Sequence, residues 1–499
     1  MSAPYNNYVK HLQKLADVEN AINVLAWDKE INLPTNGAHF RAQQIATLSG
    51  IAHEIQTAPS FENNLTSLLA DVDQLQPAQA KNVQLSKRQL DRSNKLDKDF
   101  VVRRSQVSSK AYHAWLDARK ANDFSLYYEP LAALVELKKE EAQRLGYEGH
   151  PYDALMEEYE PGATTKDIDQ LFAEVKTQLS DFAKKIRNLN PVDDQFLQQH
   201  FPKDQQWEWG LALLKNMGYD FSSGRQDLSP HPFTTNFSPQ DVRVTTRVDE
   251  NNLSNMAWSC IHEGGHALYE QGLPVENYGL PLGKYISLGI HESQSRLWEN
   301  NVGRSFAYWQ AHYSDLQRRF PDQLGKISVE TFYRGINRVQ AGRIRTESDE
   351  IHYHFHIMIR YEIEKALIEG SLQTKDLKAI WKEQYQRYLN VTVTDDNQGI
   401  LQDIHWAIGS FGYFPTYSLG SIYAAQFFQQ ATKDIPNLNA QIQKGENQQL
   451  LQWLRENIHQ HGRRYNAQEL CIKLTGEKLN FKYFMAYAED KYKGIYEGL

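Results

Sequence analysis

Apolar residues recur every three to four positions along most of this chain, and this spacing constrains its fold more than any other feature. In the stretch YVKHLQKLADVENAINVLAW, one face of the expected helix carries Val9, Leu12, Leu15, Ala16 and Ile22. The same spacing predicts further helices over 37–57, 80–121, 125–146, 165–188, 299–320, 350–370, 375–390 and 438–460. Breaks rich in Pro and Gly, such as NLPTNG and YEPGAT, separate these segments. The sequence therefore predicts a mainly α protein.

One segment departs from the helical spacing. DVRVTTRV, residues 241–248, places Val242 and Val244 on one side and Arg243, Thr245 and Arg247 on the other. That alternation is typical of a strand with one polar face. The preceding HPFTTNF is predicted to be a second strand or an extended loop. A small β-sheet is therefore expected just before residues 260–272.

Composition excludes several classes of protein. The 499 residues are 41% hydrophobic and 23% charged, with a net charge of −8 and no run of basic residues. Neither nucleic-acid binding nor membrane binding is expected from such a chain. The first residues do not resemble a secretory signal, and the two cysteines, Cys260 and Cys471, lie far apart. We therefore expect a cytoplasmic location.

Residues 260–272, CIHEGGHALYEQG, contain a candidate metal site. On a helix, His262 and His266 lie about 40° apart around the axis and one turn apart along it, so both can face one ion. Glu263 lies about 100° round, where it is better placed to take a proton from water than to bind the ion. This arrangement predicts metal-assisted hydrolysis, in which the ion activates water and polarises a carbonyl.

Two glycines lie in the middle of this expected helix. Gly264 and Gly265 each cost about 1 kcal/mol relative to alanine in a helix interior. A surface helix whose histidines meet by chance has no reason to carry them. Close approach of another backbone segment or of a substrate is such a reason. The apolar flanks, NMAWSCI and ALY, also favour a buried helix.

A catalytic zinc needs a third protein ligand. The extended metzincin pattern is excluded, because Tyr269 and Gly272 occupy its glycine and histidine positions. The downstream carboxylates are Glu270, Glu276, Glu292 and Glu299. Glu270 lies too far along the same helix, whereas Glu292 opens a new amphipathic helix that can pack against the first. We therefore favour Glu292 as the third ligand, with His291 as its competitor.

A second pair of histidines four apart, His352 and His356 in HYHFH, has no glutamate after its first histidine. It continues into the apolar stretch IMIRYEIEKAL, so we expect these histidines to pack in the core.

Several motifs in order resemble the M32 metallocarboxypeptidases of the carboxypeptidase Taq type, nearly from end to end. They are HPF (231–233), DVRVT (241–245), HEGGH (262–266), HESQ (291–294), IRTESDE (344–350) and GILQDIHW (399–406). Ser348 departs from the family pattern, which usually has alanine there.

The resemblance implies a helical fold related to neurolysin and angiotensin-converting enzyme, with a deep central groove. It implies one catalytic unit over residues 1–499, with two lobes around the groove and a metal-site core at about 230–420. It further implies a homodimer that removes single residues from the free C-termini of peptides with broad specificity. Zinc is the expected ion, and cobalt or manganese are substitutes.

The matching motifs also imply roles for individual residues. His262, His266 and Glu292 match the metal ligands, and Glu263 matches the general base. Arg345 falls in the motif associated with recognising the C-terminal end of the substrate.

The free carboxylate of such a substrate needs a cation, and arginine binds carboxylates in bidentate pairs. Arg345 is the leading candidate, and Arg343 and Arg243 are alternatives. The competing interpretation of Arg345 is a structural salt bridge to Asp349 or Glu350.

The strand at 241–248 is a further candidate for substrate binding. An extended peptide can pair with an open strand edge, so the substrate-binding group also includes Asp241 and Thr245.

The oxyanion of the reaction needs hydrogen-bond donors. By analogy with the angiotensin-converting enzyme relatives, His405 and Tyr417 are the candidates, and packing is the alternative for Tyr417. The competing functions are an endo-acting zinc oligopeptidase of the neurolysin type and a helical binding protein with a vestigial site. The intact chemical residues argue against the second, and the absence of a GxMEN stretch argues against an aminopeptidase.

Overall fold

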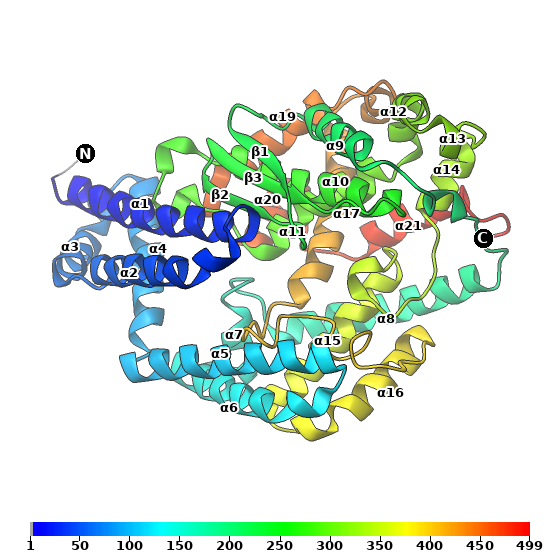
Figure 1. Cartoon of the computed structure of the whole chain (residues 1–499). Helices are drawn as coiled ribbons and strands as arrows, with labels where there is room; N and C mark the ends of the chain where they lie inside the picture. The colour runs from blue at the N-terminus through cyan, green and yellow to red at the C-terminus, as the bar shows by residue number, and fades with distance from the viewer. Residues whose placement is uncertain (1–2) are drawn as a thin grey trace.

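The computed structural model describes residues 3–499 and is built mainly of helices, as the apolar spacing predicts (Figure 1). The expected single helix over 80–121 is two helices, because Asp97 interrupts it. The Asp97 carboxylate accepts a hydrogen bond from the amide of Phe100 and so begins a new helix. Among the described helices, none combines the length and the low polarity that crossing a bilayer requires.

The first four helices lie together at one end of the molecule (Figure 1). They have small apolar clusters of their own, one around Tyr8 and Leu65 and one around Leu15 and Ile55. The first helix also contacts the sheet, where the guanidinium of Arg243 lies 4.3 Å from the ring centre of Trp27. The bounds are α1 (Ala3–Ile31), α2 (Ala38–Gln56), α3 (Pro59–Ala70) and α4 (Pro77–Asn94).

A second group of helices forms the lower half of Figure 1. These are α5 (Lys98–Ala121), α6 (Tyr128–Leu145), α7 (Pro151–Met156), α8 (Thr165–Arg187), α15 (His352–Glu369) and α16 (Leu377–Leu389). The helix α15 is nearly all buried and packs against α6, α7, α8 and α16.

The remaining helices form the upper half. They are α9 (Lys203–Met217), α10 (Leu253–Gln271), α11 (Leu288–Arg296), α12 (Phe306–Arg319), α13 (Pro321–Leu324), α14 (Val329–Ile336), α17 (Pro415–Asp434), α18 (Leu438–Ile442), α19 (Gln448–Asn457), α20 (Ala467–Thr475) and α21 (Lys482–Lys493). The largest apolar core runs through both halves, from Phe100 to Tyr496. The helix α17 packs against α11, α15, α20 and α21, so it joins the two halves.

The small sheet has three strands, β1 (Gly224–Leu228), β2 (Thr234–Ser238) and β3 (Asp241–Thr246), in the order β1-β3-β2. The pair β1 and β3 is parallel, and the pair β2 and β3 is antiparallel. The sequence identified β2 and β3 but missed β1. The predicted open edge along β3 is wrong, because β3 is the central strand and is hydrogen-bonded on both sides. The free edges belong to β1 and β2.

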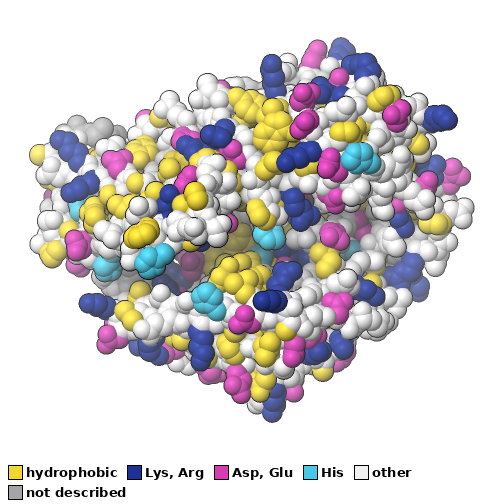
Figure 2. All heavy atoms as spheres, in the orientation of Figure 1, with side chains coloured by type: hydrophobic (Ala, Val, Ile, Leu, Met, Phe, Trp, Pro, Cys, Tyr) yellow, Lys and Arg dark blue, Asp and Glu magenta, His cyan; other side chains and the backbone are white. Residues whose placement is uncertain are grey.

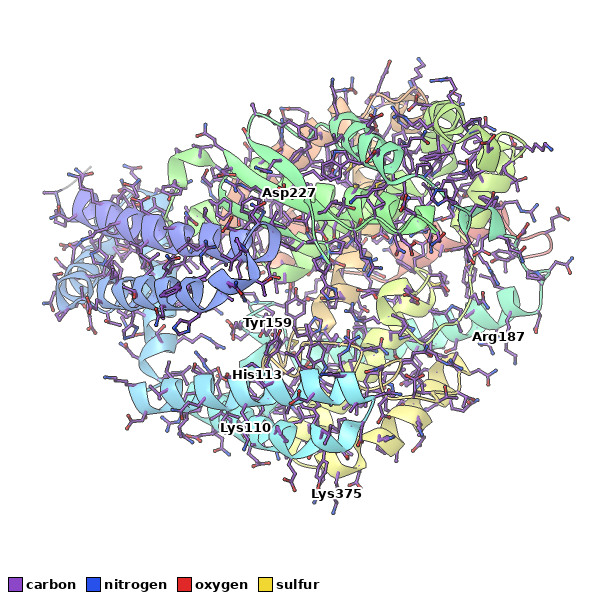
Figure 3. The ribbon with its side chains drawn as sticks, viewed as in Figure 1. Lys110, His113, Tyr159, Arg187, Asp227 and Lys375 are labelled. Atoms are coloured by element: carbon purple, nitrogen blue, oxygen red, sulfur yellow. The ribbon has the colours of Figure 1, made fainter. Side chains whose placement is uncertain are left out.

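The molecule is hollowed between the part that carries α1 and α2 and the part that carries α5 and α6 (Figure 2). This hollow agrees with the expected groove. Figure 3 places His113, on α5, and Tyr159, which follows α7, beside it. The ring of Tyr159 lies 5.1 Å from that of Tyr413, just before α17, so the hollow leads towards α17.

Candidate metal centre

The helices α10 and α11 approach each other closely at Gly265. A Cβ atom at this position would lie 2.6 Å from the Cα of Ser295 and 2.7 Å from the carbonyl oxygen of Gln294. These are backbone atoms, so only glycine allows this contact. The close approach that the two glycines predicted is confirmed at Gly265. At Gly264, a Cβ would meet only the side chains of Leu214 and Met217.

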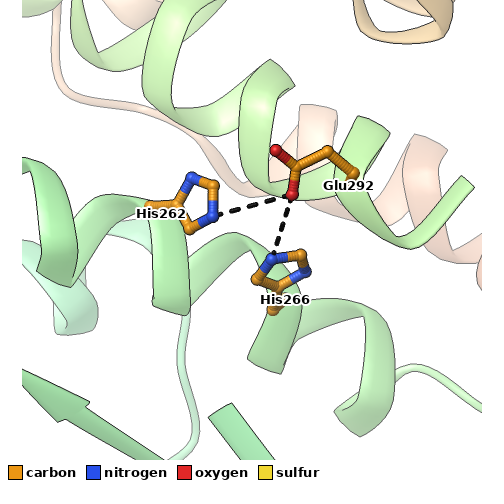
Figure 4. A group of neighbouring side chains, drawn as sticks. All are labelled: His262, His266 and Glu292. Atoms are coloured by element: carbon orange, nitrogen blue, oxygen red, sulfur yellow. Dashed lines mark ion pairs between the residues drawn. The ribbon is translucent and has the colours of Figure 1, made fainter. Parts of the chain in front are cut away.

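This approach brings the three predicted ligands together (Figure 4). Oε2 of Glu292 lies 3.7 Å from Nε2 of His262 and 3.4 Å from Nε2 of His266. Ligand atoms on a tetrahedral zinc, at about 2.0–2.2 Å from the ion, lie roughly 3.3–3.6 Å apart. The two imidazoles and one carboxylate therefore suit a zinc ion in both chemistry and spacing. Within residues 3–499, no second group of three such side chains is this close.

Glu292 is held on both of its oxygens. Arg296 donates from Nε to Oε1 at 2.7 Å, and the Ser295 hydroxyl donates to Oε2 at 3.0 Å. Burial raises the pKa of Glu292, but Arg296 and the two histidines outweigh burial, so its net pKa lies well below the usual range. A Cβ at position 420 of α17 would lie 2.5 Å from the Cβ of Glu292, so Gly420 makes room for this side chain.

His262 is oriented by a carboxylate that the sequence analysis did not assign. Its Nδ1 lies 2.9 Å from Oε2 of Glu299, which directs Nε2 towards Glu292. Burial raises the pKa of Glu299, but Arg296 and His262 lower it to about 2 overall. Glu299 follows Glu292 by two helical turns, within the π-helix η7 (Leu297–Gly303). The seven-residue spacing places Glu299 on the same helical face as Glu292, and this spacing could have identified it from the sequence.

Glu263 lies apart from the three ligand atoms. Its Oε2 accepts a hydrogen bond of 2.6 Å from the hydroxyl of Thr234, on β2. Burial is the largest cause that raises the pKa of the Glu263 carboxyl.

The competing ligand, His291, contacts His266 instead of joining the ligand atoms. The two Nδ1 atoms lie 2.6 Å apart, and Nε2 of His291 lies 2.8 Å from Oε1 of Glu270.

Arg345 is nearly buried and is paired with Asp403, not with Asp349 or Glu350. Its Nε and Nη2 lie 2.9 Å from Oδ1 of Asp403. The same carboxylate accepts from the fully buried Arg360 at 2.6 Å. Two guanidinium groups therefore share one carboxylate, and the cluster carries one net positive charge. Arg360 and Asp403 were not predicted from the sequence.

The other candidates for substrate binding have different partners. Arg343 donates to the carbonyl of Thr392 and to Gln398. Arg243 pairs with Asp241 at 2.8 Å on β3.

Thr245 is buried, so the strand lacks the fully polar face that alternation predicted. Its hydroxyl accepts a hydrogen bond from the amide of Phe233, which ties β3 to the segment before β2.

His405 and Tyr417 lie together, with Nε2 of His405 at 3.0 Å from the hydroxyl of Tyr417. Burial, followed by Arg345, lowers the pKa of His405 to about 3, so the ring is neutral. The guanidinium of Arg345 lies 4.8 Å from the ring centre of Tyr417. Tyr417 and Gly420 lie on the same helix, three residues apart, and Gly420 lies against the side chain of Glu292. The pair is therefore close to the candidate metal ligands.

Tyr353 joins the two parts of the site. Its hydroxyl accepts from Nη1 of Arg345 at 3.3 Å, and the guanidinium of Arg296 lies 4.2 Å from its ring centre. Because Arg296 donates to Glu292, these contacts connect Arg345 to the candidate metal ligands.

The histidines of HYHFH pack in the core, as expected. His352 bonds to Asp349 at 2.8 Å, and His356 lies 3.1 Å from the hydroxyl of Tyr385.

Comparisons with known proteins agree with this geometry. Residues 7–492 match the family described as Carboxypeptidase Taq (M32) metallopeptidase. The chain is 40% identical to Carboxypeptidase 1 of Bacillus subtilis, over 97% of both chains. Among solved structures, it is similar to one named CHT (57% identity, TM-score 0.96, covering 98% of this chain and 99% of that one). It is also similar to the M32 carboxypeptidase of Deinococcus radiodurans R1 (36% identity, TM-score 0.96, covering 99% of both). The chain therefore belongs to the carboxypeptidase Taq (M32) family of metallopeptidases, and it is a metal-dependent carboxypeptidase.

Proposed function

We propose that this enzyme removes single amino acids from the free C-termini of peptides, with His262, His266 and Glu292 as ligands of a zinc ion. Cobalt or manganese would substitute for zinc. When bound, the ion polarises the scissile carbonyl and lowers the pKa of water. The cluster of Arg345, Arg360 and Asp403, which has one cation in excess, is the observation that supports an exopeptidase rather than an endopeptidase.

In this proposal, Glu263 is the general base. Its carboxylate is held by Thr234 and lies near enough to His262 and Glu292 to interact with them electrostatically, so it would stand beside the ion and not bind it. A raised pKa brings a carboxylate closer to the pKa that a general base needs near neutral pH.

Arg345 is the proposed partner of the α-carboxylate of the substrate. Asp403 occupies its Nε and Nη2, so Nη1, beside Tyr353, is the group that can turn to a bound carboxylate. Since Arg360 already satisfies the other oxygen of Asp403, the excess positive charge favours an incoming anion.

His405 and Tyr417 are the proposed donors to the oxyanion. Burial, with Tyr413 second, raises the pKa of Tyr417 well above its usual value, so its hydroxyl keeps its proton. The neutral His405 has one ring proton, and donating it from Nε2 to this hydroxyl at 3.0 Å orients the Tyr417 proton towards the oxyanion before the substrate binds.

Two further points rest on the family resemblance. We infer that residues 1–499 act as one catalytic unit and that two copies form a homodimer. Light scattering coupled to gel filtration measures the mass of the particle and so tests the homodimer.

The test compares one peptide as its free acid and as its C-terminal amide, with products followed by mass spectrometry. The enzyme should shorten the acid one residue at a time and leave the amide uncut. Replacement of Arg345 by methionine should reduce kcat/KM for the acid by about 10- to 100-fold, because a hydrogen bond to a charged group contributes about 1.5–3 kcal/mol. The matched variant Arg343→Met should behave like the wild type. Equal cleavage of the acid and the amide would favour the neurolysin-type oligopeptidase.

A further inference from the structure

A chain of hydrogen bonds leads from His266 away from the ligand atoms. Nδ1 of His266 lies 2.6 Å from Nδ1 of His291, and Nε2 of His291 lies 2.8 Å from Oε1 of Glu270. The amide nitrogen of Asn236 donates to Oε2 of Glu270 at 2.6 Å. We call these four residues the relay.

The hydrogen-bond directions in the relay follow from the metal site. If Nε2 of His266 offers its lone pair to the ion, the single proton of the neutral ring is on Nδ1. Nδ1 of His291 must then accept, which places the proton of His291 on Nε2. That proton points at Glu270, whose other oxygen already accepts from Asn236. Every contact in the relay then has one donor and one acceptor.

The opposite direction is incompatible with metal binding. If His291 donated from Nδ1, Nδ1 of His266 would have to accept, and its proton would occupy Nε2. That nitrogen lies 3.4 Å from Oε2 of Glu292, where a ligand lone pair is required. The carboxylate of Glu270 accepts only, so it selects the direction that frees Nε2 of His266.

Packing fixes the ring of His291 in this position. The rings of Tyr269 and Tyr285 lie 5.2 Å and 5.0 Å from it, and its side chain is only 13% exposed. The side chain of Glu270 is 4% exposed. Asn236 lies two residues after Thr234, which holds Glu263, so one face of β2 orients both glutamates of α10.

We propose that His291 and Glu270 are positioning residues that hold His266 in the tautomer with a free Nε2, and that Asn236 fixes the end of this relay. This inference rests on the proposed role of His266 as a metal ligand. Loss of such an outer partner typically reduces metal affinity about 10- to 100-fold.

The experiment measures the zinc affinity of the metal-free full-length enzyme by competition with a chromophoric chelator, together with its Tm. We expect His291→Phe to raise the zinc Kd about 10- to 100-fold. His291→Gln should restore much of the affinity, because glutamine accepts with its oxygen and donates with its nitrogen, as His291 does. His312→Phe, at a half-buried histidine of α12, is the matched control and should leave the affinity unchanged.

The outcomes separate the relay from simple packing and from the metal site itself. Phenylalanine keeps the ring shape, so a packing role predicts that His291→Phe binds zinc at least as well as His291→Gln, and that result would overturn the relay. Unchanged affinity in His291→Phe would also overturn it, while leaving the metal centre in place. A wild-type chain that takes up no stoichiometric zinc would refute the proposed metal centre, and the relay with it.

Discussion

The two sides of the active site are built differently. On the metal side, His262, His266 and Glu292 come from the packed helices α10 and α11, and each has its own hydrogen-bond partner. On the arginine side, Arg345 begins a single 3-10 turn, η8 (Arg345–Glu347), and His405 lies in a loop, and the shared carboxylate of Asp403 holds Arg345 against α15.

Different physical interactions therefore fix the geometry of the two sides. Close backbone contact sets the geometry of the metal side, since a glycine at 265 and another at 420 let helices touch. On the arginine side, ion pairs set the geometry, and their imbalance leaves a positive charge beside Tyr353 and Tyr417. The metal side is expected to control the chemical step, and the arginine side is expected to select the end of the substrate.

The largest effect is expected from a substitution that removes a chemical group from the metal side without changing its geometry. Glu263→Gln should lower kcat by about 10²- to 10⁴-fold, since it removes the proposed general base. Zinc content, measured by atomic emission, should stay at the wild-type level, because Glu263 is not one of the proposed ligands. Glu276→Gln, at an exposed position after α10, is the control. Undiminished hydrolysis by Glu263→Gln would remove this residue from the mechanism.

The second prediction concerns Glu160, in the segment after α7. Its carboxylate accepts from the amide of Gly289 at 2.8 Å and from the hydroxyl of Ser287, at the start of α11. Burial raises the pKa of Glu160 from 4.5 to about 7, although the two hydrogen bonds oppose this shift. The folded state therefore keeps its proton to a higher pH than the unfolded chain does.

The proton on Glu160 stabilises the folded state at low pH. This contribution to stability is fully present below pH 4.5 and is lost as the pH rises through 7. In Glu160→Gln the side chain is always neutral, so the variant should lose about 2–3 kcal/mol less stability than the wild type between pH 5 and 8. Urea unfolding of the metal-free enzyme at several pH values measures this, and the exposed Glu158→Gln is the control. Parallel pH profiles of wild type and Glu160→Gln would show that Glu160 titrates normally.

The smallest expected effect tests the backbone contact of the metal side. Gly265→Ala should destabilise the metal-free enzyme by about 1–3 kcal/mol, because the new methyl group meets the backbone of Ser295. Gly264→Ala should cost less, since its methyl group meets the movable side chains of Leu214 and Met217. The difference in Tm between the two variants measures the contact. Equal Tm values would show that α11 shifts away without cost.

Some residues of the site could be predicted from the sequence, and others could not. The pair His262 and His266 is visible because one helical turn separates its members, and Glu292 because it lies in the next helix along the chain. The pairing of Arg345 with Asp403 joins residues 58 positions apart, and no local pattern encodes that contact. The open edge predicted for 241–248 was wrong because β1, rich in polar residues, did not show as a strand.

The sequence by itself determined the helical class, the family and the spacing of the candidate metal ligands, because helical periodicity and short motifs depend on neighbours within a few residues. Only the tertiary structure decided which charges are paired, which strand is central and how the relay runs from His266 to Asn236. Those features depend on contacts between distant segments, whose energies appear only when burial removes water from the polar groups that meet there.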